Sequence, residues 1–267
     1  MIRLFCCLLF CLTFLSCKDA FDMHPYDVRF DGQENINAIN IERIERLCSG
    51  KDTMHVAFIS DTHGWYADTK DMVKSINAKG NVDFAVHLGD LTDCGTTKEY
   101  VWMRDILAGI RVPYVAIIGN HDFLGTGDQT FHRMYGQNDY TFIAGRVKFV
   151  CLNTNATEYD YLAAVPNLDY MEGEIGKDSL LYDRTVVCMH ARPYSEQFNN
   201  NVAKVFHHYV KSFPGLMFCM NGHDHCKQAE DIYGDGVMYY GVDCAEHRSY
   251  MVFTITENGY DYEIVHY

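Results

Sequence analysis

Short apolar runs alternate with segments of helical spacing along this chain, and that alternation limits its fold more than any other feature. The apolar runs cover residues 54–60, 82–88, 114–118, 147–152, 185–189 and 216–220. Helical patterns lie between several of them, at residues 68–78, 97–110, 129–135 and 202–213. This β-α-β-α-β order predicts an α/β (α+β) fold with helices on the faces of a sheet.

The two ends of the chain differ from this centre. Residues 35–50 predict a helix that stops at Gly50, and its apolar residues at helical spacing are Ile36, Ile39, Ile44 and Leu47. Ahead of it, residues 17–30 predict a tether and a short edge strand. The last third contains β runs joined by turns, "ENGY" among them, and predicts antiparallel strands. Since no repeat or linker divides residues 51–267, we interpret them as one domain.

The first residues predict export. "MIRLFCCLLFCLTFLSC" has one basic residue, an apolar run from Leu4 to Leu15, and then Ser16 and Cys17, a pattern too short for a membrane-spanning helix. We interpret residues 1–16 as a signal peptide that resembles those of bacterial lipoproteins, with Cys17 as the residue that receives lipid. An ordinary cleaved signal peptide is the alternative. Both predict a periplasmic or cell-surface protein, and the first adds membrane contact through the lipid anchor.

Charge and cysteine content narrow the expected partners. The chain has 22 basic and 36 acidic residues, and the predicted signal peptide removes only Arg3. So acidic a surface repels polyanions, which argues against duplex nucleic acid but allows small phosphate esters where metal ions reverse the local charge. Among the cysteines after Cys17, those inside apolar runs are Cys151, Cys188 and Cys219. We expect these to be core thiols, and the odd number of cysteines without a C-x-x-C pair indicates no particular disulfide pairing.

Five of the apolar runs are followed by side chains of types that can bind metals. These are Asp61 and His63, Asp90, Asn120 and His121, His190, and His223 and His225. Ligands bind at the carboxyl ends of the strands in an open α/β sheet, so we expect these side chains to converge there. Glycines precede Asp90, Asn120 and His223, and they permit a close approach of the backbone.

In order, these residues spell D-x-H, G-D, G-N-H-[DE], H and G-H-x-H, and the chain resembles the calcineurin-like metallophosphoesterases over about residues 54–245. The resemblance implies a four-layer αββα sandwich with mixed sheets and a dinuclear metal centre. One cation would be held by Asp61, His63 and His225, the other by Asn120, His190 and His223, with Asp90 bridging them. His121 would be a catalytic residue that is not a ligand. Purple acid phosphatases have a tyrosine where this chain has Asp93, which disfavours an iron–tyrosinate centre.

The expected chemistry explains these residue types. Two divalent ions about 3.5–4 Å apart neutralise phosphate oxygens, clamp the attacking and leaving oxygens in line, and activate a bridging hydroxide as the nucleophile. A mixed set of oxygen and nitrogen ligands suits Mn, Fe or Zn. His121 would assist the leaving group. Asp122 is a candidate for holding the His121 tautomer, with simple N-capping or solvation as the alternative. Arg192 is a candidate for binding the substrate phosphate, with an ordinary loop position as the alternative.

The sequence therefore predicts an exported dinuclear-metal phosphoesterase that hydrolyses phosphomonoesters or phosphodiesters. The alternative is a non-catalytic lipoprotein that keeps the same fold as a binding scaffold. A mononuclear metal centre is disfavoured because the seven candidate ligands are too many for one ion. His87, which lies in an apolar run three residues before Asp90, is interpreted as a packed core histidine.

Overall fold

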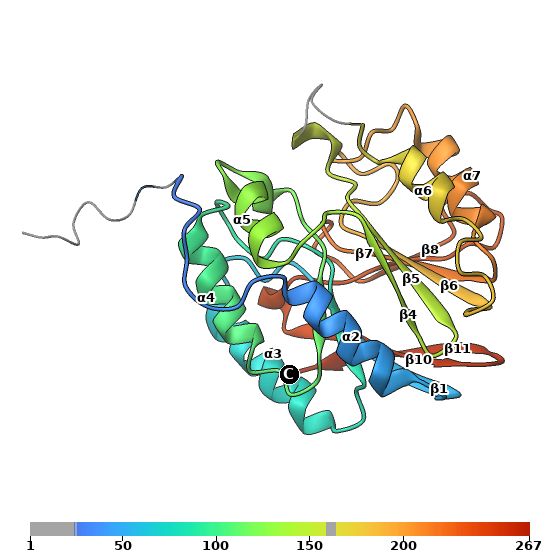
Figure 1. Cartoon of the computed structure of the whole chain (residues 1–267), viewed down its shortest axis with the longest axis horizontal. Coiled ribbons are helices and arrows are strands. Elements are labelled where there is room, and N and C mark those ends of the chain that lie inside the picture. Colours follow the sequence, from blue (N-terminus) through green and yellow to red (C-terminus); the bar gives the residue numbers. More distant parts are fainter. Residues whose placement is uncertain (1–23, 25, 159–163) are drawn as a thin grey trace, which may run out of the picture.

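Two β-sheets pack face to face in the computed structural model, which describes residues 24, 26–158 and 164–267 (Figure 1). The first sheet has the order β11-β10-β1-β2-β3. Its strands are β1 (Thr53–Ile59), β2 (Phe84–His87), β3 (Tyr114–Ala116), β10 (Ser249–Thr256) and β11 (Gly259–His266). The first three run parallel, while β10 and β11 add an antiparallel hairpin beside β1.

The second sheet has the order β4-β5-β6-β7-β9-β8. Its strands are β4 (Tyr140–Ala144), β5 (Val147–Leu152), β6 (Arg184–Met189), β7 (Leu216–Asn221), β8 (Gln228–Glu230) and β9 (Tyr239–Gly241). The inner strands β5, β6, β7 and β9 are parallel, and β4 and β8 are antiparallel at the two edges. Both sheets are therefore mixed.

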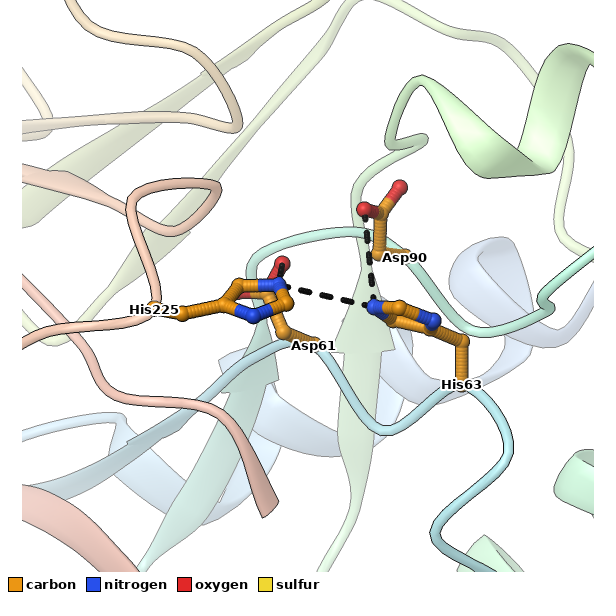
Figure 2. A group of neighbouring side chains, drawn as sticks. All are labelled: Asp61, His63, Asp90 and His225. Carbon is orange, nitrogen blue, oxygen red and sulfur yellow. Dashed lines mark hydrogen bonds and ion pairs between the residues drawn. The ribbon is translucent and has the colours of Figure 1, made fainter. Parts of the chain in front are cut away.

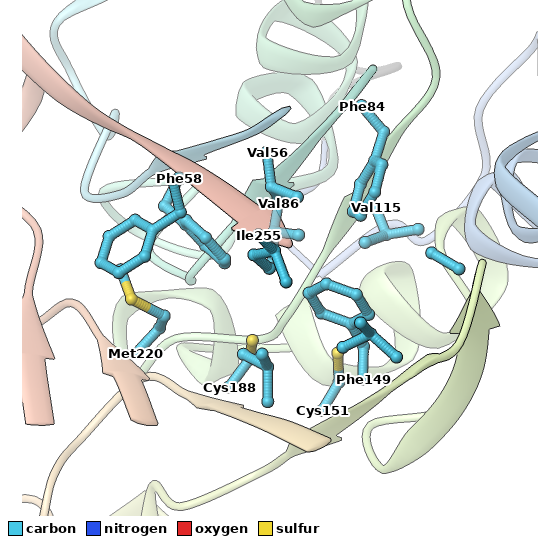
Figure 3. Close-up of a cluster of buried hydrophobic side chains, with 14 of the residues drawn as sticks. Val56, Phe58, Phe84, Val86, Val115, Phe149, Cys151, Cys188, Met220 and Ile255 are labelled. Atoms are coloured by element: carbon cyan, nitrogen blue, oxygen red, sulfur yellow. The ribbon is translucent and has the colours of Figure 1, made fainter. Parts of the chain in front are cut away.

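Side-chain alternation along β1 explains the layers. Val56 and Phe58 point into the core between the sheets, where they meet Phe149 and Met220 of the second sheet (Figure 3). Ile59 belongs to the opposite face, which packs against the helices. These helices are α3 (Tyr66–Lys79), α4 (Thr97–Leu107) and α5 (Gly127–Met134).

The outer face of the second sheet is covered by α6 (Leu168–Glu174) and α7 (Ala203–Ser212). Figure 1 shows them on the side of the sheets opposite to α3 and α4. The predicted four-layer αββα sandwich is confirmed. The structure also has strand β4 and strand β8, which the apolar runs did not predict because most of their residues are only partly buried or exposed.

The predicted N-terminal helix is present as α2 (Ile36–Cys48), but its buried face differs from the expected one. The buried stripe follows a four-residue spacing through Ile36, Asn40, Ile44 and Cys48. Ile39 and Leu47 are 43% and 52% exposed. Two of the inward-facing residues are asparagines. The apolar pattern does not indicate them, because polar residues normally face solvent.

Those asparagines cover the edge of the first sheet. Asn37 receives the Ala116 N–H at 2.9 Å and donates to the Ala116 carbonyl at 2.8 Å, and Asn40 donates to the Tyr114 carbonyl at 2.8 Å. Both partners belong to β3, the outermost strand of that sheet. Helix α2 thus satisfies backbone groups that an edge strand normally leaves open.

The predicted edge strand in residues 17–30 is wrong for the part that the structure describes. Residues 26–30 form no strand, because side chains of the helices take up their carbonyl groups. Thr97 donates to the Asp27 carbonyl, and Arg133 donates to the Val28 carbonyl at 3.2 Å. The predicted signal peptide and Cys17 lie outside the described residues.

The C-terminal prediction holds for the β10–β11 hairpin, which turns within "ENGY". It holds for β9 only on one side, because β9 is antiparallel to β8 but parallel to β7. The cysteines that the structure describes are all free thiols, and Cys151, Cys188 and Cys219 are buried as expected. Within residues 24, 26–158 and 164–267, no helix combines the length and apolar character needed to cross a bilayer.

We predict that Asn37→Ala lowers the free energy of unfolding by about 1–3 kcal/mol, because the buried N–H of Ala116 loses its acceptor and the Ala116 carbonyl keeps only the hydrogen bond from the Tyr140 hydroxyl. Glu42→Ala on the exposed face of α2 is the matched control and should change stability little. Urea unfolding of both variants measures the difference. Equal stabilities would show that α2 does not protect the sheet edge in this way.

Candidate metal centre

The strand-end residues singled out in the sequence converge at one edge of the sandwich. Asp61 and His63 follow β1, Asp90 follows β2, and Asn120 follows β3. His190 follows β6, and His223 and His225 follow β7. The two sheets thus contribute loops to the same place, as the parallel strand directions predict.

Four of these side chains form one donor group (Figure 2). Asp61, His63, Asp90 and His225 each offer one ligand atom, and these atoms all lie within 4.8 Å of one another. The His225 Nε2 atom is 3.2 Å from Asp61 Oδ1 and 3.5 Å from His63 Nε2. Two imidazole nitrogens that face each other and a carboxylate at this spacing are arranged as ligands of a common cation.

A second donor group lies beside the first. The Asn120 Oδ1 atom is 3.0 Å from His190 Nε2 and 3.0 Å from His223 Nδ1. The Asp90 Oδ2 atom is 3.4 Å from His190 Nε2 and 4.0 Å from His63 Nε2. Asp90 therefore lies between the two groups, which is the position expected of a carboxylate that bridges two ions.

Close backbone contact makes this convergence possible. A Cβ atom on Gly119 would lie 2.1 Å from the Asp90 backbone nitrogen, and one on Gly222 would lie 1.9 Å from Ser60 Oγ. Asp61 and Asp90 themselves have positive φ angles of 50° and 58°, a conformation that is costly for residues with a side chain. Such strain is typical of functional sites.

The second nitrogens of two imidazoles fix which atom faces the centre. His190 Nδ1 is 2.8 Å from the Leu88 carbonyl, which can only accept, so Nδ1 carries a proton and Nε2 presents its lone pair. His63 Nδ1 lies 3.3 Å from Asp93 Oδ1, which has the same effect. Metal-ligating histidines characteristically donate their other N–H in this way.

The electrostatics of the centre favour positive charge. Burial opposes protonation of His190, but the Asp90 carboxylate outweighs it and raises the pKa of His190 to about 9. The Asp61 carboxylate, 3.2 Å from His225 Nε2, and then the contact with Cys244 raise the pKa of His225 to about 11. Burial raises the pKa of Asp61 and Asp90, yet the neighbouring imidazoles lower both below the ordinary value. The protein thus surrounds two buried carboxylates with cations.

The residues fit a pair of transition-metal ions. Ligand atoms about 2.0–2.2 Å from one such ion are separated by roughly 3 Å. Both groups contain pairs near this spacing, although His63 Nε2 and Asp90 Oδ2 are 4.0 Å apart. Asp61 Oδ1 is fully buried and has no hydrogen bond of good geometry among the described residues, so it has an unused lone pair. The seven side chains are positioned as the prediction requires, and their role as ligands stays a prediction.

His121 lies at the rim, and its side chain is 37% exposed. Its ring stacks on the ring of His63 with centroids 4.7 Å apart. Its Nδ1 atom is 2.8 Å from the Asp93 carbonyl, so Nδ1 carries the proton and Nε2 is free to act on a substrate. Asp93 thus supports both His63 and His121, and its position three residues after Asp90 was the signal for this in the sequence.

The expectation that Asp122 holds the His121 tautomer is wrong. The Asp122 carboxylate is buried and turned away, and it accepts hydrogen bonds from the backbone N–H groups of Leu91, Thr92 and Gly119 at 2.9–3.1 Å. The Thr92 hydroxyl donates to it as well, at 2.8 Å. Burial and then the charge of Asp90 raise the pKa of Asp122 to about 7, while these donors oppose that shift. Asp122 joins the loop after β2 to the loop after β3.

Arg192 is not free in this structure. Its Nε atom donates to Asp224 Oδ2 at 2.6 Å, and its Nη1 atom lies 3.7 Å from Glu230 Oε2. Asp224 stands between the candidate ligands His223 and His225. The guanidinium therefore joins the loop after β6 to the loop after β7, and substrate binding by Arg192 stays a prediction.

We predict that Asp122→Asn lowers the free energy of unfolding by about 1–3 kcal/mol, because an amide NH₂ group would face a backbone N–H donor in a buried site. Asp52→Asn, at an exposed position, is the control. Thermal unfolding of both proteins measures the effect. A variant as stable as the control would mean that these hydrogen bonds do not secure the two loops.

Comparison with known proteins agrees with this geometry. A 3',5'-cyclic-nucleotide phosphodiesterase of Nostoc sp. is 26% identical over 60% of this chain and 58% of its own length. A glycerophosphodiester phosphodiesterase of Enterobacter lignolyticus is 35% identical over 26% of this chain and 30% of its own. The aligned region thus spans less than two thirds of either relative.

Among solved structures, a dimetal phosphatase from Danio rerio has the same fold, with a TM-score of 0.57 and 12% identity over 80% of this chain and 99% of that one. The family description "calcineurin-like phosphoesterase" matches residues 54–227, which is more than half of the chain. That family is hydrolytic and uses a dinuclear divalent metal centre. This chain belongs to the calcineurin-like phosphoesterase family.

Proposed function

We propose that this protein is an exported, metal-dependent phosphoesterase that hydrolyses phosphodiesters of small alcohols. The observation that carries the proposal is the pair of donor groups that share Asp90. The scaffold alternative would be favoured by missing ligands, yet all seven candidate positions carry a donor side chain that faces the centre.

Two arguments favour diesters over monoesters. The Nostoc and Enterobacter relatives are both named phosphodiesterases. The rim also supplies little free positive charge for a dianionic monoester, because Arg192 is paired with Asp224 and Asp93 adds a carboxylate beside His63. A diester carries a single negative charge and needs less compensation.

The chemistry follows from the side chains present. Two divalent cations, when bound, would neutralise the phosphoryl oxygens and make a water molecule nucleophilic near neutral pH. Asp61, His63 and His225 would hold one of them, and Asn120, His190 and His223 the other. Because Asn120 contributes a neutral oxygen, only the carboxylates of Asp61 and Asp90 reduce the positive charge of the centre.

His121 is placed to handle the proton of the leaving alcohol. Its Nδ1–H is held by the Asp93 carbonyl, which leaves Nε2 as the atom that exchanges a proton. Stacking against His63 fixes the plane of its ring next to the first donor group. A protonated Nε2 would donate to the departing oxygen, which lowers the cost of breaking the P–O bond.

Export and lipidation complete the proposal. Residues 1–17 have the charge, apolar run and cysteine of a lipoprotein signal. Attachment at Cys17 would keep the catalytic domain at a membrane surface, outside the cytoplasm.

We predict that the protein loaded with Mn²⁺ or Zn²⁺ cleaves bis-(p-nitrophenyl) phosphate with a higher kcat/KM than p-nitrophenyl phosphate. Chelation should abolish turnover because it removes the metal ions. Asp90→Asn should abolish turnover because it removes the carboxylate that the two ions would share. Release of p-nitrophenolate measures the rate, and Asp169→Asn, at an exposed position, is the control. Full activity after either treatment would exclude the proposed mechanism, and fewer than one metal per purified chain would favour the scaffold.

We predict that Cys17→Ala moves the protein from the membrane fraction of the expressing bacterium to the soluble exported fraction. Globomycin, which blocks lipoprotein signal cleavage, should make the unaltered chain accumulate in a larger form. Fractionation followed by mass spectrometry of the N-terminus measures both effects. Cleavage at another residue without lipid would support the ordinary signal peptide instead.

A further inference from the structure

His87 lies at the end of β2, three residues before Asp90, and is not part of the proposed ligand set. It is the last residue of β2 and is paired on both sides, with Ile59 of β1 and Ala116 of β3. Its side chain is fully buried. The sequence indicated a packed core histidine, but a histidine costs more to bury than an apolar residue unless both ring nitrogens are satisfied.

Both ring nitrogens have partners, and the partners belong to the two loops that carry the candidate ligands. The Gly89 backbone N–H donates to His87 Nδ1 at 3.2 Å. The Thr62 hydroxyl lies 2.8 Å from His87 Nε2. Since Nδ1 accepts a hydrogen bond, the proton of the neutral ring is on Nε2, which donates to Thr62 Oγ1.

These two loops need such support, because they hold the ligands in costly backbone conformations. Thr62 lies between Asp61 and His63, and Gly89 precedes Asp90. Asp61, Gly89 and Asp90 all have positive φ angles. Backbone hydrogen bonds already connect the loops, from Asp61 N to the Gly89 carbonyl at 3.0 Å and from Thr62 N to the Asp90 carbonyl at 3.0 Å. His87 adds the side-chain connection between them.

We propose that His87 is a positioning residue, a neutral Nε2–H imidazole that joins the Thr62 loop to the Gly89 turn and so sets the separation of Asp61 and Asp90. The distance between these two carboxylates decides whether Asp90 can bridge two cations. The inference therefore rests on the proposed function. It assigns to His87 a role that a merely space-filling core residue would not have.

The neutral form of the ring suits this place. Burial lowers the pKa of His87 to about 3, although the carboxylates of Asp61 and Asp90 act in the opposite direction. A charged imidazole at His87 would repel cations bound at the neighbouring candidate metal centre. With protons on both ring nitrogens, His87 would also offer no acceptor to the Gly89 N–H.

The tautomer can be tested without any variant. Nitrogen-15 NMR of the unaltered protein, labelled at histidine, should show one buried ring with a protonated Nε2 and a bare Nδ1, both with and without Mg²⁺ as a diamagnetic metal probe. His87→Gln identifies the signal by its loss. A protonated Nδ1 at this ring would overturn the inference.

The positioning role is tested by metal affinity. His87→Leu removes both hydrogen bonds, and we expect Zn²⁺ affinity, measured by competition with a chelating dye, to fall about 10–100-fold. The control is His207→Leu. His207 is also buried with two bonded ring nitrogens, but it contacts Tyr239 and Asp235 rather than the ligand loops. It should lower thermal stability similarly and leave Zn²⁺ affinity unchanged.

Conservative variants separate the two hydrogen bonds. The amide of Asn reaches the Nδ1 position and can accept from Gly89, whereas that of Gln reaches the Nε2 position and can donate to Thr62. His87→Asn and His87→Gln should each recover part of the lost affinity. Thr62→Val should weaken binding alone but add little to His87→Leu, since the shared bond is already lost.

The outcomes distinguish this inference from the proposed function. Loss of Zn²⁺ affinity in His87→Leu but not in His207→Leu supports positioning, even if the unaltered protein hydrolyses no phosphate ester. Unchanged affinity in a folded His87→Leu or Thr62→Val variant overturns it, even if the unaltered protein is an active phosphodiesterase.

Discussion

The close approach of two glycine backbones to neighbouring loops at the strand ends is the constraint on which the rest of the centre depends. Gly119 meets Asp90, and Gly222 meets Ser60, at distances that leave no room for a side chain. Only through these contacts do loops from two different sheets present their carboxylates and imidazoles to a common point. The wide core between the sheets, with its phenylalanines and aliphatic residues, holds the strands rigidly enough to keep those loops in place.

A centre built in this way is costly for the fold. Asp61 and Asp90 are buried, and both have backbone angles that favour glycine. Their negative charge raises the pKa of the imidazoles of His190 and His225 beside them. The network around them is therefore largely one of support. Asp122, His87 and Arg192 each join two of the loops, so that the strained ligand positions are fixed by more than one interaction.

Features of the fold and of the candidate site were predictable where they follow from local sequence patterns, and not where they depend on contacts between distant residues. The αββα layers and the convergence of the seven polar side chains followed from apolar periodicity and from motif order, which are local. The inward-facing Asn37 and Asn40 were not predictable, because nothing local distinguishes an asparagine that bonds a sheet edge from one in water. Asp122 shows the same limit. Its neighbour in sequence is His121, but its partners in space lie about 30 residues away, at Leu91 and Thr92.

The placement of α2 has a further consequence. The family match begins at residue 54, after this helix has ended, so α2 lies outside the region that defines the family. Nevertheless its asparagines close the open side of β3, the strand that leads to Asn120. A chain without α2 would carry a bare strand beside the candidate metal centre, available for pairing with another molecule. The N-terminal helix thus acts as a built-in guard against strand-to-strand self-association.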